Sequence, residues 1–116
     1  MENKRRVGFD KETQAAEYLE SQGLQIVERN FYFRGGELDL IARDKEYLCF
    51  IEVKYRKSEQ YGCPEEAVTE NKQKKLFLGA RRYLYERHMP EDTPCRFDVV
   101  SITGDAIRWI PDAFLR

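Results

Sequence analysis

Two short stretches of this sequence place ionisable side chains among residues that otherwise look like buried strand, at positions 36–41 (GELDLI) and 50–54 (FIEVK). Charges on core-forming strands are costly unless they are paired, hydrogen-bonded or bound to a metal. These charged positions are therefore candidates for chemistry. Because side chains alternate along a strand, Glu52 and Lys54 are expected to share one face.

The same alternation applies to the first stretch. It predicts that Glu37, Asp39 and Ile41 share one face of a strand. The opposite face would then carry only apolar side chains: Leu38, Leu40 and Ala42. Glu37 is expected to cap a turn or pair with a nearby cation.

An acid on one strand and an acid-x-Lys on its neighbour suit metal-dependent hydrolysis of a phosphodiester. Mg²⁺ or Mn²⁺ held by carboxylates activates water and offsets the charge that builds on phosphorus. We expect Asp39 and Glu52 to be the metal ligands, with the Val53 carbonyl as a third. Lys54 is the candidate for water activation. Glu12 is expected to approach the metal through a water molecule.

Each of these charged residues could instead have a purely structural role. Glu52 and Lys54 lie two residues apart and could form an ion pair of purely structural value. Asp39 could cap a turn or pair with Arg34 or Arg56.

The chain around these stretches predicts seven regular elements. A helix is expected at about 8–21, strands at 24–33, 37–43 and 47–55, a helix at roughly 64–88 with a break near Thr69, and strands at 96–102 and 107–110. The order α-β-β-β-α-β-β predicts a single-domain α/β sandwich in which helices cover a mixed sheet. The three consecutive strands should pair antiparallel, with 47–55 central because it is the most continuously apolar.

Glu12 is misplaced on the first predicted helix, which begins at Gly8. The apolar side chains of this helix fall on one stripe: Ala15, Ala16 and Leu19. Glu12 lies on that stripe, three to seven residues before those positions, whereas an ordinary surface acid would lie on the opposite face. Its structural alternative is a hydrogen bond from the backbone around residues 35–36.

Composition limits the class of protein. The chain has 116 residues, 41% hydrophobic and 35% charged, which fits one globular domain. No apolar run approaches the ~20 residues of a membrane span, and no signal peptide is recognisable, so we expect a cytoplasmic protein with no membrane partner. Three cysteines and one histidine, without metal-type spacing, argue against a zinc site or a disulfide framework.

The charge distribution is more informative than the net charge of −1. Residues 35–52 carry five acidic and two basic side chains, net −3, whereas residues 53–87 carry nine basic and five acidic ones, net +4. An acidic pocket beside a basic segment suits a protein that holds metal next to a polyanion. A solvated helix face would give the same basic run.

These residues together match a family pattern. The matching positions are Gly8, Glu12, Ala15-Ala16, Tyr18-Leu19, Gly23, Arg29-Asn30, 36–42 (GELDLIA), 50–54 (FIEVK), Arg56, Gly62, Pro64, Lys72, Tyr83-Leu84, Trp109-Ile110 and Ala113-Phe114. The chain resembles the YraN-like family of small bacterial proteins, within the PD-(D/E)XK nuclease superfamily. The resemblance implies a restriction-endonuclease-like core, closest in layout to archaeal Holliday-junction resolvases.

The resemblance also implies roles for individual residues. The helix acid of the superfamily falls on Glu12, its metal aspartate on Asp39, and its acid-x-Lys on Glu52 and Lys54. A helical Gln or Lys often lies near such sites, and Lys72 or Gln73 is the candidate here. Leu38 stands where the literal proline of the superfamily name would be, as in the resolvase-like branch.

The expected activity is therefore that of an Mg²⁺- or Mn²⁺-dependent DNA endonuclease, with branched DNA as a candidate substrate. The expected nucleic-acid contacts are Arg56, Lys57, Lys72, Gln73 and Lys75, and the wider basic set adds Lys74, Arg81 and Arg82. A non-catalytic nucleic-acid-binding module and an interaction protein without nucleic acid are the alternatives. A homodimer is left open.

Overall fold

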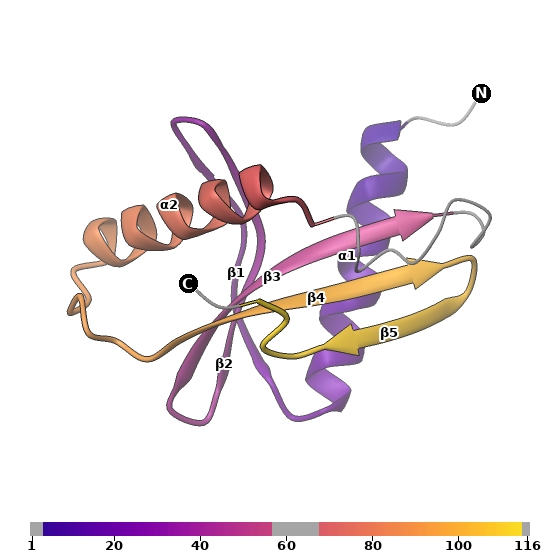
Figure 1. The fold of residues 1–116 in the computed structure, drawn as a ribbon. Coiled ribbons are helices and arrows are strands. Elements are labelled where there is room, and N and C mark those ends of the chain that lie inside the picture. The colour runs from indigo at the N-terminus through magenta and orange to yellow at the C-terminus, as the bar shows by residue number, and fades with distance from the viewer. Residues whose placement is uncertain (1–3, 57–67, 115–116) are drawn as a thin grey trace.

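The regular elements follow the predicted order in the computed structural model, which describes residues 4–56 and 68–114 (Figure 1). They are α1 (Lys4–Ser21), β1 (Gln25–Phe33), β2 (Gly36–Asp44), β3 (Tyr47–Arg56), α2 (Glu70–Glu86), β4 (Cys95–Thr103) and β5 (Ala106–Ile110). The prediction of a single α/β domain with two helices and a mixed sheet is confirmed.

The five strands form one sheet in the order β1-β2-β3-β4-β5. The first three are an antiparallel meander, as predicted, and β3 is the central strand. The chain then crosses over through α2 and returns as β4, which runs parallel to β3, before β5 closes the sheet antiparallel. A parallel neighbour requires such a crossover, since a short hairpin can only reverse the chain.

The two helices cover opposite faces of the sheet, and each face has its own apolar cluster. The cluster under α1 contains Ala15, Ala16, Leu19, Leu24, Leu40, Ala42, Cys49, Ile51, Val100 and Ile102. The cluster under α2 contains Phe31, Leu38, Ile41, Leu48, Phe50, Leu76, Ala80, Tyr83, Leu84 and Phe97. The apolar stripe predicted for the first helix is buried here, and burial of an apolar face holds each helix on the sheet.

The alternation predicted for β2 is wrong at one point. Leu38 and Ile41 both pack in the cluster under α2, whereas Leu40 and Ala42 pack under α1. The β1–β2 register passes directly from the pair of Arg29 and Leu40 to that of Phe31 and Leu38. Between them lies Asn30, whose φ of 55° is in the left-handed region, so the pairing is interrupted opposite Asp39.

The predicted helix boundaries also need correction. α1 begins at Lys4, so Gly8 lies inside it and is not its first residue. An interior glycine costs a helix only about 1 kcal/mol, which the packing of α1 outweighs. α2 begins at Glu70 because Thr69 is its N-cap, where a break was predicted; residues 64–67 lie outside the described part of the chain.

The second helix, α2, ends at Glu86, two residues before the predicted limit, and the backbone enters the left-handed region at His88. Neither described helix is long and apolar enough to span a lipid bilayer.

Candidate metal centre

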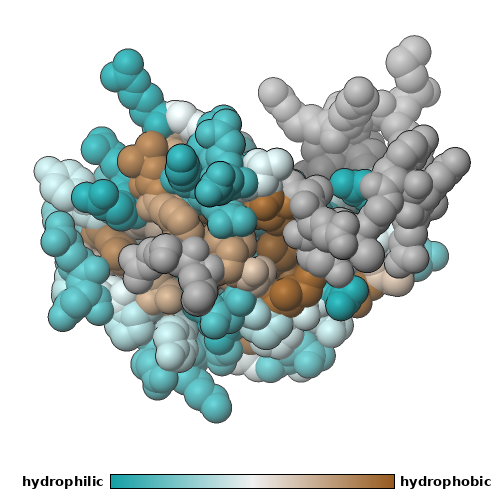
Figure 2. All heavy atoms as spheres, viewed as in Figure 1, coloured by the Kyte–Doolittle hydropathy of each residue, from teal (hydrophilic) through white to brown (hydrophobic). Residues whose placement is uncertain are grey.

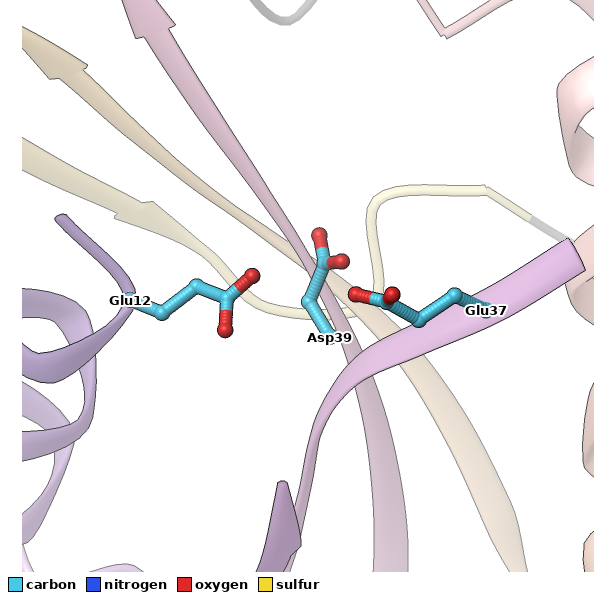
Figure 3. A group of neighbouring side chains, drawn as sticks. All are labelled: Glu12, Glu37 and Asp39. Carbon is cyan, nitrogen blue, oxygen red and sulfur yellow. The ribbon is translucent and has the colours of Figure 1, made fainter. Parts of the chain in front are cut away.

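Three carboxylates converge beside the interruption in the β1–β2 pairing. Glu12 extends from α1, while Glu37 and Asp39 extend from β2, and Figure 3 shows the two glutamates pointing toward Asp39 from opposite sides. One oxygen of each lies within 4.8 Å of one oxygen of each of the others. Like charges so close repel one another, so this arrangement requires protons, a cation or compensating donors.

Asn30 supplies compensating donors. Its side-chain amide donates to Oε1 of Glu12 at 2.8 Å and to Oε1 of Glu37 at 3.1 Å. Arg29 adds a long ion pair to the same oxygen of Glu12 at 3.9 Å. The alternative of a backbone contact from residues 35–36 to Glu12 is thus replaced by a side-chain contact.

Asp39 lies where the β2–β3 ladder ends. The last paired residues are Leu40 and Ile51, and beyond them Oδ2 of Asp39 accepts a hydrogen bond from the backbone N–H of Val53 at 3.0 Å. Burial and, after it, the neighbouring Glu52 carboxylate raise the pKa of Asp39 to about 8, although the hydrogen bond from Val53 opposes this shift. Burial also raises the pKa of Glu12, which the contact from Asn30 opposes.

Glu52 is the most buried of the acids near Asp39, with 5% of its surface exposed. Its Oε1 atom forms ion pairs with Lys72 of α2 at 3.3 Å and with Lys54 at 3.8 Å. Its Oε2 atom is buried and has no hydrogen-bond partner among the residues that the structure describes. A buried carboxylate oxygen without a partner costs about 1–3 kcal/mol or more, so this atom calls for a ligand.

The donor set fits a hard divalent cation. Glu52 lies close enough to raise the pKa of both Asp39 and Glu12, although it lies outside the tight group formed by Glu12, Glu37 and Asp39. Carboxylate oxygens are the ligands that Mg²⁺ and Mn²⁺ prefer, and a cation here would offset the repulsion between the acids. It would also give Oε2 of Glu52 a partner.

The structure thus brings together the four residues predicted to be catalytic: Glu12, Asp39, Glu52 and Lys54. The ion pair between Glu52 and Lys54, which was the structural alternative, is present in the same arrangement. Val53 contributes its N–H to Asp39, and the role of its carbonyl as a metal ligand stays a prediction.

Two residues of the site, Glu37 and Asn30, were not predicted from the sequence to belong to it. Glu37 was expected to pair as an ordinary acid, yet it belongs to the tight carboxylate group. Asn30 was noticed only as part of the family pattern, together with Arg29. The signal that could have identified it is its residue type, since asparagine tolerates a left-handed bend better than most residues and can bridge two carboxylates.

The predicted nucleic-acid contacts divide into several groups. Lys72 reaches the acids, whereas the side chain of Gln73 donates to the Val68 carbonyl at 3.1 Å and so secures the first turn of α2. Lys75 is exposed on α2, and Arg56 is half-buried at the end of β3. Lys57 lies outside the described residues.

Comparison with known proteins gives a consistent family result. Residues 11–102 match the model described as "Uncharacterised protein family UPF0102". A UPF0102 protein of Lachnoclostridium phytofermentans is 50% identical over 112 residues, covering 97% of this chain and 95% of the relative. UPF0102 proteins of Hahella chejuensis and Pectobacterium carotovorum are each 46% identical over 113 residues; the alignments cover 93% and 97% of this chain and 89% and 96% of those relatives.

Proposed function

This chain belongs to the uncharacterised protein family UPF0102, and we propose that it is a metal-dependent endonuclease that hydrolyses phosphodiester bonds in DNA. The YraN-like resemblance inferred from the sequence is confirmed by this membership. The observation that carries the proposal is the buried Oε2 atom of Glu52, which has no hydrogen-bond partner in the described part of the chain and lies beside Asp39, whose pKa is raised to about 8. Such a pair of acids is costly to maintain for structure alone and suits a bound cation.

In this proposal Asp39 and Glu52 hold Mg²⁺ or Mn²⁺, with the Val53 carbonyl as a third donor. The cation, when bound, supplies Lewis-acid stabilisation of charge on the phosphate and makes a water molecule easier to deprotonate. The bond cleaved is between phosphorus and a sugar oxygen, and the products are two ends of the DNA strand, one of which retains the phosphate.

The side chains around Asp39 and Glu52 would position the attacking water and stabilise the charge on the phosphate. Lys54 donates to the attacking water or to a phosphate oxygen, and its positive charge offsets the charge that develops in the transition state. Lys72 holds Oε1 of Glu52 and leaves Oε2 directed elsewhere. Glu12, whose pKa is raised by burial, is a better proton acceptor than an exposed glutamate and is suited to receive the proton of the water.

The expected substrate contacts are to the phosphate backbone. The exposed or half-buried basic residues Arg56, Lys72 and Lys75 lie on β3 and α2, the two elements that supply Glu52 and its partner Lys72. Such contacts give affinity that falls steeply with salt and read little sequence, which agrees with recognition of DNA shape, including branched DNA. A cytoplasmic location belongs to the same proposal.

One observation favours a non-catalytic nucleic-acid-binding module as the second candidate. Glu52 already has two lysine partners, at 3.3 and 3.8 Å, so part of its charge is balanced without any metal. In that case the acids would shape the fold and the basic residues would bind DNA alone. Binding that is indifferent to metal and to Glu52 substitution would follow.

Cleavage of labelled duplex, single-stranded, flap and four-way-junction DNA tests the proposal. Each substrate is incubated with Mg²⁺, Mn²⁺ or EDTA and with wild type, Glu52→Gln or Lys54→Ala. We expect metal-dependent cutting that falls roughly 100-fold or more in both variants, because each removes a group that acts on the reacting phosphate.

The matched control is Glu46→Gln, which removes an exposed acid from the β2–β3 turn and should leave the rate unchanged. Equal cutting by all four proteins would point to a contaminating nuclease. No cutting by any of them, with DNA binding intact in EDTA, would favour the binding module.

A further inference from the structure

A hollow of about 660 Å³ lies between the β1–β2 hairpin and α2, and its lining includes none of the site carboxylates. Its lining is aromatic, aliphatic and cationic apart from one acid: Tyr32, Phe33, Arg34, Leu78, Arg82 and Glu86. Figure 1 shows the hairpin rising beside the middle of α2, and Figure 2 shows apolar side chains at the surface near α2 with hydrophilic ones around them. Tyr32 is 70% exposed and Leu78 is 53% exposed, so the apolar groups face solvent.

A second tyrosine extends this surface along α2. Tyr85 is 74% exposed, and the guanidinium of Arg82 lies 5.7 Å from the centroid of its ring. Arg34 lines the same hollow as Arg82, and Arg81 lines a neighbouring one with Arg82 and Tyr85. These three arginines outnumber the two acids in the lining, Glu86, which pairs with Arg82 at 2.8 Å, and Glu91. We call the group Tyr32, Arg34, Leu78, Arg81, Arg82 and Tyr85 the tyrosine–arginine surface.

The elements that carry the tyrosine–arginine surface, the β1–β2 hairpin and α2, also carry residues of the acidic site. Tyr32 is the cross-strand partner of Glu37, a member of the carboxylate group. On α2, Leu78 follows Lys72 by six residues, which is about 9 Å along a helix. A flexible chain bound at the acids could therefore continue onto this surface.

We propose that the tyrosine–arginine surface binds unpaired nucleotides of the strand whose phosphate lies at the acidic site. Bases stack on exposed aromatic rings regardless of sequence, and arginines beside the rings contact phosphates or stack themselves. Bases inside a duplex are already stacked and cannot use the rings in this way. The inference rests on the proposed function, since it assumes that a nucleic acid occupies the site, and it identifies the substrate as DNA with an unpaired segment.

A second copy of the chain fits this surface less well. In a two-fold dimer the patch of one protomer meets the same patch of its partner, so the net positive charge of the two patches would be brought together. Like charges brought together in a desolvated interface oppose association. A polyanion meets the same arginines with the complementary charge.

Fluorescence anisotropy in EDTA tests the inference without any cleavage. The probes are fluorescein-labelled oligothymidylate and a blunt duplex, and the variants are Tyr32→Ala combined with Tyr85→Ala, and Tyr32→Phe combined with Tyr85→Phe. We expect the alanine pair to weaken oligothymidylate binding at least about fivefold for each ring lost, with duplex binding within about twofold of wild type. The phenylalanine pair should bind as wild type because it keeps both rings.

Tyr47→Ala is the matched control, since Tyr47 is an exposed tyrosine in a different hairpin, between β2 and β3. Unchanged oligothymidylate affinity in the alanine pair would overturn the inference. So would a wild-type dimer in sedimentation velocity that the alanine pair converts to monomer without any change in DNA affinity.

Cleavage of a four-way junction in Mg²⁺, measured on the same proteins, separates the two proposals. Ring-dependent binding without any cleavage by wild type would overturn the nuclease and support the surface. Cleavage that depends on Glu52, with ring-independent binding, would support the nuclease and overturn the surface.

Discussion

The Oδ2 atom of Asp39 accepts a hydrogen bond from the backbone N–H of Val53 at 3.0 Å, past the last β2–β3 pair of Leu40 and Ile51. A side chain here takes the place of a backbone carbonyl in the ladder. The exchange gives the backbone N–H of Val53 an acceptor and brings a carboxylate close to Glu52, which follows Ile51 on β3. The end of the β2–β3 backbone pairing and the closeness of the two acids thus have the same structural cause.

The pKa of Asp39 predicts how the metal-free protein responds to pH. This pKa is raised from an ordinary value of 3.8 to about 8, so the folded state retains a proton that the unfolded chain releases. The stability contributed by this group is fully present below about pH 4 and is lost as the pH rises toward 8. Urea unfolding in EDTA should therefore show a decline of up to about 1.4 kcal/mol per pH unit within that window.

Two comparisons test the assignment to Asp39. Asp39→Asn keeps an acceptor for the Val53 N–H but does not titrate, and it should flatten the dependence on pH. Mg²⁺ added near pH 8 should restore stability to wild type and much less to the variant. A pH-independent wild type would contradict the predicted pKa.

The double contact of Asn30 predicts a role in holding Glu12 and Glu37. Asn30→Gly removes both hydrogen bonds but keeps a residue that accepts a φ of 55°. We expect cleavage, or Mg²⁺ affinity followed by calorimetry, to fall roughly 10- to 100-fold, as for other residues that orient metal ligands.

Asn30→Ala separates the side chain from the backbone. It removes the same contacts and also forces a Cβ residue into the left-handed region, which costs about 1–2 kcal/mol more in urea unfolding than the glycine variant. If both variants matched wild type in metal affinity, the amide of Asn30 would have no part in the site.

The N-cap of α2 predicts a coupling between helix stability and the site. Oγ1 of Thr69 accepts a hydrogen bond from the backbone N–H of Lys72 at 3.1 Å, and the side chain of Lys72 contacts Glu52. Thr69→Ala should cost about 1 kcal/mol of stability and loosen the turn that carries this lysine. Thr69→Ser retains the hydroxyl and should lie within a few tenths of a kcal/mol of wild type; equal losses in both would exclude the cap as the cause.

The packing of Gly79 predicts a substitution that opposes helix propensity. A Cβ at this position would lie 2.6 Å from Cε1 of Phe33 and 3.0 Å from Cδ2 of Leu38, so α2 must shift or the ring must move. Gly79→Ala gains about 1 kcal/mol from propensity and loses about 1–3 kcal/mol from overpacking, so we expect no gain or a net loss in thermal unfolding. Asn71 is exposed on the same helix, so Asn71→Ala should be neutral or stabilising. A stabilised Gly79→Ala would show that Phe33 and Leu38 of the hairpin can move aside at little cost.

Local sequence patterns were sufficient for the elements and their order. The continuous run of apolar residues at 47–55 identified the central strand, and the stripe of Ala15, Ala16 and Leu19 identified the buried face of the first helix. These properties depend on periods of two and 3.6 residues, which any short segment displays by itself. The same reasoning singled out Glu12, because an acid on an apolar stripe is unusual.

Other features depended on contacts between segments far apart in the chain. No local pattern shows that Asn30 on β1 would bend into the left-handed region and bridge an acid of α1 to one of β2. The bend interrupts the pairing opposite Asp39 and invalidates the strict alternation predicted for β2.

The sequence by itself thus determined which elements form and singled out Asp39, Glu52 and Lys54 as the candidates for chemistry on them. The tertiary structure alone decided that Glu37 joins the acids, that Lys72 pairs with Glu52, and that one oxygen of Glu52 is buried without a partner among the described residues. The reason is physical. Residue type and period are local properties, whereas burial and the distances between charges arise only when the helices pack on the sheet.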